Sequence, residues 1–389
     1  MAKEWTTNAN ITLAEIRTGE PGKEYQYQLG VANDGIKAIQ KALHMYGYNL
    51  NLATGQTADG IYGAYTQANV RGFQTANGIE PATGIMDAKT LAKLEAWSGR
   101  LYETPTATPA LKAVEYGLDI LHIGDSGAAV YSVQSLLTRH GFTCQTTGSY
   151  TSTVVSLVKQ FQKKNSLDET GNVDQVTLAV LEDLTSATAW LNGSTVNLTA
   201  GKLAKAGFHG IVLKPEVVAD INKGLNKYGI TTGEKVLHFL AQAMEETKKG
   251  EEVIEDLYKP GELGGAWYAP FYGAGVFQVS TERNYKDFSA HVNNPDNGYT
   301  KDEKIYCGSN LNENLYVTQH VALKYPGTSA GWYWDKVKNI NGEVDWNADS
   351  ETVSNQVTKL VFSENASISA MKKRHEHYES IKSILKYNS

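Results

Sequence analysis

The chain carries one sequence pattern twice, at residues 36–94 and 130–181, and this internal repeat limits the possible folds more than any other feature. Corresponding positions hold the same residue types in the same order: Gln40 and Gln134, Gly47 and Gly141, Phe73-Gln74 and Phe161-Gln162, Asn77 and Asn165, and Thr90-Leu91 and Thr177-Leu178. Apolar residues recur at helical spacing in both copies, and Asp87 and Asp174 suit helix N-cap positions. Each copy is therefore predicted to form three short helices: one before the glycine, one ending near the phenylalanine, and one at its end.

The recurring glutamines, the glycine, the Phe-Gln pair and the final Thr-Leu pair make the two copies resemble the peptidoglycan-binding domain 1 family of small three-helix cell-wall modules. The resemblance covers about residues 36–95 and 118–185. It implies that bacterial peptidoglycan is the partner of this part of the chain. A generic helical repeat used for packing or dimerisation is the alternative interpretation.

The chain of 389 residues is too long for one ordinary core, so we expect several domains in a mainly α-helical protein. Two Ser/Thr- or Pro/Thr-rich stretches, 103–109 and 186–197, are typical of joints. The expected division is an N-terminal segment with the first module over 1–102, a linker over 103–117, the second module over 118–186, a linker over 187–197, and a lysozyme-like helical domain with minor β structure over 198–389.

Composition restricts the possible partners. The net charge is −6 and no long basic run offsets it, which argues against nucleic acid. Lys372, Lys373 and Arg374 are interpreted as a solvated helix face. No apolar stretch reaches transmembrane length, so no membrane insertion is expected. Cys144 and Cys307 lie far apart and are expected to be free thiols.

The chemistry is expected in the third domain. Thr232 suits an N-cap, and a helix with one apolar face is predicted over 234–247. Glu246 falls in its last turn beside the apolar face, where partial burial and the helix terminus raise the pKa of a carboxyl group. Gly250 breaks the helix, so Glu255 can lie across a cleft from Glu246. An inverting glycoside hydrolase requires two such carboxyl groups on separate elements, although many glutamates at helix ends are merely solvated.

Several motifs make this domain resemble glycoside hydrolase family 19, the family of chitinases and phage lysozymes, over about residues 217–360. In family order the motifs are Leu225–Ile230, Phe239–Gln242, Glu246-Thr247, Tyr272–Ser280, Asn284-Tyr285 and Ser329–Trp334. This order of several motifs is more specific than any one of them.

The resemblance implies that Glu246 is the general acid, that Glu255 is the general base and that Ser280 helps to hold the attacking water. The residues it implies at the substrate are Gln278, Asn284, Tyr272, Tyr285 and Trp332. Loop capping is the alternative for the two amide side chains. Glu262 is the alternative base if the loop after Gly250 aligns differently.

The sequence departs from the family pattern in three places. Glu245 stands where the family has His, and Ala274 replaces an Arg that ordinarily organises the acids. The family's Ile-Asn-Gly-Gly element is matched only by 361–364. These departures leave open altered subsites, a retuned acid, or a domain that binds glycan without cutting it.

The whole chain resembles a bacteriophage endolysin, a peptidoglycan hydrolase that cleaves the β-1,4 glycan backbone by inverting acid–base hydrolysis. Acid–base hydrolysis requires no cofactor, and the histidines show no zinc-ligand spacing, so neither a cofactor nor a metal is expected. The alternatives are a non-catalytic cell-wall-binding or phage structural protein with a decayed hydrolase domain, and a chitinase. A papain-like amidase is disfavoured because Cys307 has no local nucleophile motif.

The N-terminal sequence lacks the apolar region of a secretory signal. We therefore expect a monomer that is made in the host bacterial cytoplasm and acts on the cell wall after release.

Overall fold

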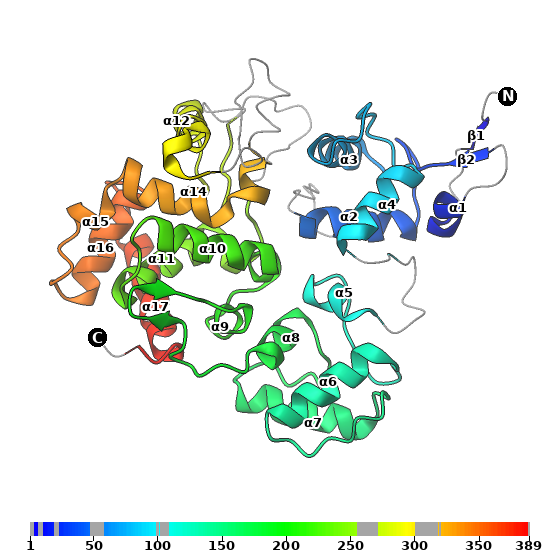
Figure 1. Cartoon of the computed structure of the whole chain (residues 1–389), viewed down its shortest axis with the longest axis horizontal. Helices are drawn as coiled ribbons and strands as arrows, with labels where there is room; N and C mark the ends of the chain where they lie inside the picture. Colours follow the sequence, from blue (N-terminus) through cyan, green and yellow to red (C-terminus); the bar gives the residue numbers. More distant parts are fainter. Residues whose placement is uncertain are drawn as a thin grey trace.

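The computed structural model describes residues 4–6, 11–18, 23–46, 58–98, 101, 109–254, 271–299, 318 and 320–387. The fold is mainly helical, as the sequence predicts, and Figure 1 shows its helices in three groups. The described strands are short: β1 (Glu4–Thr6) pairs in parallel with β2 (Lys23–Tyr25), and β3 (Leu191–Asn192) pairs antiparallel with β4 (Thr195–Val196). No helix within the described ranges combines the length and the apolar character needed to cross a membrane.

Each repeat folds into three helices, which confirms the prediction. They are α2 (Asp34–Tyr46), α3 (Ala64–Ala76) and α4 (Ala88–Ser98) in the first repeat, and α6 (Ala128–Arg139), α7 (Ser152–Lys164) and α8 (Gln175–Glu182) in the second. Asp87 caps α4 by accepting a 2.8 Å hydrogen bond from the backbone N–H of Thr90. Asp174 caps α8 in the same way, at 2.8 Å from the N–H of Thr177. A short helix, α1 (Leu13–Thr18), precedes the first repeat and packs against α4.

Four buried glutamines explain the repeated Gln positions: Gln40, Gln74, Gln134 and Gln162. The side-chain oxygen of each accepts a hydrogen bond of 2.8 or 2.9 Å from a glycine N–H in a loop of the repeat, namely Gly60, Gly84, Gly148 and Gly171. These glycines have φ between 72° and 76°, a left-handed conformation that other residues rarely adopt. The side-chain NH2 group of each glutamine donates to a loop carbonyl and to a threonine hydroxyl. Each glutamine side chain thus supplies hydrogen-bond partners to loop backbone groups that are not paired within a helix or a sheet.

We predict that Gln162→Leu destabilises the second repeat, because the N–H of Gly171 and the carbonyl of Asn172 lose their partner inside a packed loop. Each unsatisfied buried group costs about 1–3 kcal/mol. Gln160→Leu, on the exposed side of the same helix, is the matched control. Urea unfolding of the two variants tests the prediction, and equal midpoints contradict it.

The third domain is helical through most of its described part. Its helices are α9 (Ala200–Lys205), α10 (Pro215–Lys227), α11 (Gly233–Glu246), α12 (Glu282–Asn293), α14 (Pro326–Trp332), α15 (Ile340–Glu343), α16 (Ser350–Val361) and α17 (Ile368–Ile384), with the shorter turns η1 (Gly210–Leu213), η2 (Lys248–Gly250), η3 (Pro295–Asn297) and η5 (Tyr333–Val337). The predicted N-cap of α11 is confirmed, because the Thr232 hydroxyl accepts a hydrogen bond from the N–H of Lys235 at 3.4 Å.

Helices α10 and α14 touch backbone to backbone. A Cβ atom at Gly224 would lie 2.4 Å from the carbonyl oxygen of Gly327, and one at Gly331 would lie 2.9 Å from that of Gly224, so only glycine fits at these positions. The buried Asp220 carboxylate accepts hydrogen bonds of 2.8 Å from the N–H groups of Gly327 and Thr328. These N–H groups belong to the first turn of α14, where backbone N–H groups have no hydrogen-bond partner within the helix. Asp220 therefore fixes the start of α14 on α10.

The second repeat and the third domain share one apolar core. Helix α9 packs so closely on α8 that a Cβ atom at Gly201 would lie 2.5 Å from the carbonyl oxygen of Ala179. Beside this contact, the Lys202 ammonium lies 3.1 Å from both carboxylate oxygens of Asp183, and both side chains are buried. Separating the two parts would expose apolar surface and break a buried ion pair.

The first repeat contacts the third domain around Lys214 and Glu216, at the start of α10. The buried Lys214 ammonium lies 5.2 Å from the centre of the Trp97 ring and donates to the carbonyl of Tyr46 at 3.3 Å. Glu216 accepts a hydrogen bond of 2.9 Å from the hydroxyl of Tyr116. Burial lowers the pKa of Lys214 to about 8, while the nearby Glu216 opposes the change.

Parts of both expected linkers form packed structure. Within 103–117, α5 (Leu111–Glu115) packs on α8, and its Glu115 carbonyl accepts a 2.9 Å hydrogen bond from the side chain of Gln175. The strands β3 and β4 lie within 187–197. Trp190, in the same stretch, is 2% exposed and donates its indole N–H to the carbonyl of Leu385 at 3.3 Å.

Candidate active site

Helix α11 ends at Glu246, and the chain turns away directly after it, as predicted from the glycine break. Lys248, Lys249 and Gly250 have φ values of 50°, 63° and 106°, which exclude a continued helix. The described chain then runs through 251–254. Glu255 and the alternative base Glu262 both lie outside the described residues.

Glu246 contacts a cation from the far end of the sequence. The guanidinium of Arg374, on α17, lies 2.6 Å from a carboxylate oxygen of Glu246. Arg374 is only 4% exposed, and its guanidinium stacks 4.6 Å from the centre of the Phe362 ring. Burial raises the pKa of Glu246 above its ordinary value; Arg374 opposes this rise, and Glu245 adds to it. The direction agrees with that expected from the position of Glu246 beside the apolar face.

The adjacent Glu245 has the opposite electrostatic setting. Its carboxylate lies 2.6 Å from Nε2 of His377 and 2.8 Å from Nζ of Lys373, both on α17. Burial alone would raise the pKa of Glu245, but the hydrogen bonds and charges of Lys373 and His377 outweigh it and lower that pKa. The pKa values of these two neighbouring carboxyl groups are thus shifted in opposite directions. Such an arrangement is common in active sites where one of two carboxyl groups must carry a proton.

The interpretation of Lys372, Lys373 and Arg374 as a solvated face is wrong for Arg374, which is buried. Lys372 and Lys373 have exposed side chains, and Lys372 lies 3.8 Å from Glu376. Lys373 and Arg374 also lie beside the carboxylates of α11. The buried residues of α17 are Arg374, Tyr378 and Ile381, and their helical spacing is the sequence signal that places Arg374 on the packed side.

We predict that Arg374→Met raises the pKa of Glu246 further and lowers the free energy of unfolding by about 3 kcal/mol at neutral pH, because a carboxylate is left buried without its cation. NMR titration of the Glu246 carboxyl carbon and urea unfolding measure the two effects. Lys372→Met removes a neighbouring exposed charge and is the control. An unchanged pKa of Glu246 contradicts the prediction.

The pH dependence has a defined sign. A carboxyl group with a higher pKa in the folded chain than in the unfolded chain binds more protons when folded. Its contribution to the free energy of unfolding therefore falls as the pH rises from the unfolded pKa through the folded pKa. In Arg374→Met this fall extends to higher pH than in the unmodified chain.

The segment 271–280 packs on the side of α11 that carries Glu246. The Phe277 ring lies 4.5 Å from that of Phe239, centre to centre. Phe239 precedes Glu246 by two helical turns, which places the two within about 20° of each other around the helix. Ala274 pairs with both Ile254 and Val279, and it is fully buried. The cation that reaches Glu246 comes from another helix, as Arg374 on α17.

The predicted amide residues are held against the backbone. The Gln278 side chain, on a residue with φ of 50°, donates to the carbonyl of Gly275 at 3.2 Å, and its buried oxygen has no hydrogen-bond partner among the described residues. Asn284 donates to the carbonyl of Ser280 at 2.8 Å. Such bonds position the loop, which is the alternative role considered for both amides. Ser280 itself is half-buried directly before the N-cap of α12, Thr281.

The predicted tyrosines support the same segment. The Tyr285 hydroxyl donates to the carbonyl of Tyr272 at 2.8 Å, and the two residues are 2% and 7% exposed. Both rings belong to the core beneath the segment rather than to its open surface.

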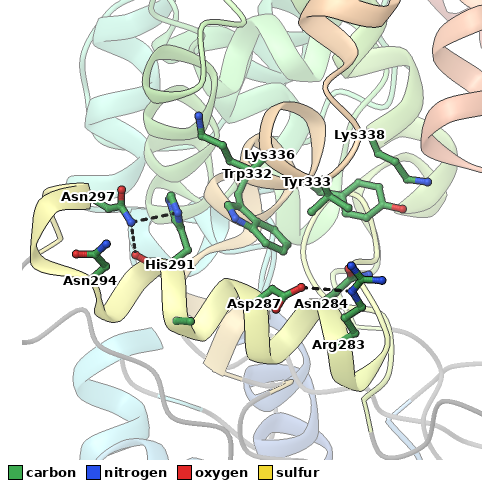
Figure 2. Close-up of a pocket in the computed structure, with 12 residues that line it drawn as sticks. Arg283, Asn284, Asp287, His291, Asn294, Asn297, Trp332, Tyr333, Lys336 and Lys338 are labelled. Atoms are coloured by element: carbon green, nitrogen blue, oxygen red, sulfur yellow. Dashed lines mark hydrogen bonds and ion pairs between the residues drawn. The ribbon is translucent and has the colours of Figure 1, made fainter.

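A groove of about 760 Å³ lies between α12 and η5, and Figure 2 shows its lining. It brings the predicted residues Asn284 and Trp332 together with His291 and Tyr333, which the sequence did not single out. Figure 2 shows Trp332 and Tyr333 facing α12. The Trp332 ring packs against Phe288, 5.1 Å between centres, and is 4% exposed, so it forms the buried floor.

The five-residue π turn η5 explains why adjacent aromatic residues point in different directions. Tyr333 is half-buried at the groove, whereas Trp334 is fully buried against Phe277 and Trp346. Turns of this kind occur often at functional sites because they redirect side chains locally.

Comparison with known proteins identifies the two repeats. Residues 32–94 and 126–181 match the family described as "Putative peptidoglycan binding domain". These ranges cover α2, α3 and the first part of α4, and α6, α7 and all but the last residue of α8. Both repeats are therefore similar to a family of peptidoglycan-binding modules, and peptidoglycan is the partner that the match supports. No curated protein matches the chain.

Proposed function

We propose that the chain is a peptidoglycan hydrolase of the endolysin type, which cleaves the β-1,4 glycan backbone. The observation that carries the proposal is Glu246: a carboxyl group with a raised pKa, at a helix end, beside the buried cation Arg374. The repeats support peptidoglycan as the substrate, since their family match concerns peptidoglycan binding.

In the proposed mechanism, Glu246 donates its proton to the glycosidic oxygen as the bond from that oxygen to the anomeric carbon breaks. Burial raises the pKa of Glu246, which is the direction that a general acid requires. Once the proton has left, the Arg374 guanidinium 2.6 Å away stabilises the carboxylate. By resemblance, Glu255 accepts a proton from water as the water oxygen attacks the anomeric carbon, and Ser280 helps to hold that water.

The repeats contribute by tethering. A module bound to an insoluble wall raises the effective concentration of the third domain at the glycan without changing the chemical step. The shared core of the second repeat and third domain fixes this arrangement more firmly than a flexible linker would.

One observation favours the alternative of a non-catalytic wall-binding protein. The 2.6 Å contact between Arg374 and Glu246 also suits a structural ion pair that keeps Glu246 ionised. Zymography on bacterial walls separates the two functions, because only the hydrolase clears the gel.

We predict that Glu246→Gln keeps the fold and reduces wall lysis by about 10²-fold or more, because the proton donor is lost. Glu351→Gln, at an exposed glutamate in the first turn of α16, is the control and retains lysis. Turbidity of wall suspensions and thermal unfolding give the two readouts. Lysis by Glu246→Gln within a few-fold of the unmodified chain removes Glu246 from the mechanism.

A second prediction concerns stereochemistry. If Glu246 and Glu255 lie on separate elements with room for water between them, as proposed, the anomeric carbon is inverted. NMR of the first-formed product from the β-linked glycan then shows the α anomer. A β anomer means retention and overturns the assignment of Glu255 as the base.

A further inference from the structure

The groove between α12 and η5 is lined by several cations in a chain of net charge −6. Its charged lining residues are Arg283, Lys336, Lys338 and Asp287. Figure 2 shows Arg283 on α12 and Lys338 across from it beside Tyr333. The groove therefore combines an aromatic floor, amide side chains and an excess of positive charge, which are the features of a site for a polar, anionic ligand.

The cations are available to a ligand because their contacts within the chain are weak. Arg283 is 90% exposed on its side chain and lies 3.6 Å from Asp287. Lys336 is 56% exposed and lies 2.9 Å from its neighbour Asp335. Exposed pairs of this kind contribute about 0–1 kcal/mol, so a ligand carboxylate competes with them readily. Lys338 lies 5.5 Å from the centre of the Tyr333 ring.

The positive field also acts on the histidine in the groove. His291 accepts or donates hydrogen bonds to Tyr228 at 3.2 Å and to Asn297 at 3.2 Å. Burial lowers the pKa of His291, and the charges of Lys227 and Lys336 lower it further. The imidazole is thereby kept neutral near neutral pH, and the cations of the groove are the lysines and the arginine.

The groove and the segment that carries Ser280 share Asn284. Its side chain lines the groove and donates to the carbonyl of Ser280, the residue implied to hold the water. From there α12 carries Arg283, Asp287 and His291 outward along one side. A glycan whose scissile bond lies near Ser280 would place its side groups along this row.

We propose that this groove binds the carboxylates of the peptidoglycan stem peptides through Arg283, Lys336 and Lys338, with Tyr333 against the sugar. This inference rests on the proposed function, which supplies peptidoglycan as the substrate. It specifies which part of that substrate the groove recognises. Peptidoglycan carries anionic peptides along its backbone, whereas chitin carries none. The groove therefore selects peptidoglycan that still has its stem peptides.

Binding to the full-length chain carrying Glu246→Gln tests the proposal, so that the glycan is not consumed. The two ligands are soluble peptidoglycan fragments with stem peptides and the same fragments after enzymatic removal of the peptides. The readout is NMR of the Trp332 indole N–H and the His291 ring, because these signals report on the groove and not on the repeats. We expect the stem-bearing fragment to bind more tightly, with an advantage that shrinks as salt is added.

The double variant Lys336→Glu and Lys338→Glu should reduce the ratio of the two affinities by about tenfold or more. The double variant Lys359→Glu and Lys372→Glu, at exposed lysines on α16 and α17, makes the same charge change away from the groove and should leave the ratio unchanged. Should the double variant at Lys336 and Lys338 unfold, Arg283→Ala is the second test, since that side chain is 90% exposed.

The two proposals fail separately. Equal affinity for both fragments, or a ratio unaffected by Lys336→Glu with Lys338→Glu, overturns the groove assignment even if the chain cleaves wall glycan. If the chain shows the expected ratio of affinities but clears no zymogram, the groove stands as a binding site and the proposed hydrolase activity is overturned.

Discussion

The close contact of α10 with α14 is the constraint on which the rest of the third domain depends. With glycine at 224, 327 and 331, the two helix backbones meet directly, and Asp220 fixes the start of α14. The carbonyl of Pro326 then reaches the N–H of Val276 at 2.8 Å, which anchors the segment beside α11. The same contact places Trp332 and Tyr333 against α12. The surroundings of Glu246 and the groove therefore both depend on the contact between α10 and α14.

The two adjacent glutamates of α11 receive different partners from α17. Lys373 and His377 lower the pKa of Glu245, whereas burial raises the pKa of Glu246 although Arg374 opposes the rise. Each glutamate therefore has a cationic partner on α17, Glu245 with Lys373 and His377 and Glu246 with Arg374.

The parts that the sequence predicted are those set by local rules. Helix periodicity, the caps at Asp87, Asp174 and Thr232, and the end of α11 each depend on a few neighbouring residues. The partner of Glu246 could not be predicted in that way, because a run of basic residues has the same pattern on a solvated face and on a packed one. Likewise, the groove depends on the π turn η5, which directs Tyr333 and Trp334 to different sides, and no local sequence pattern predicts such a turn.

The ion pair between Glu246 and Arg374 spans 128 positions of the sequence. Contacts of such separation carry a large loop-closure entropy and form only after much of the intervening chain has collapsed. A chain in which α11 had formed but α17 had not docked would hold two adjacent carboxylates without Lys373, Arg374 or His377 beside them. Titration of Glu246 would therefore report the docking of α17.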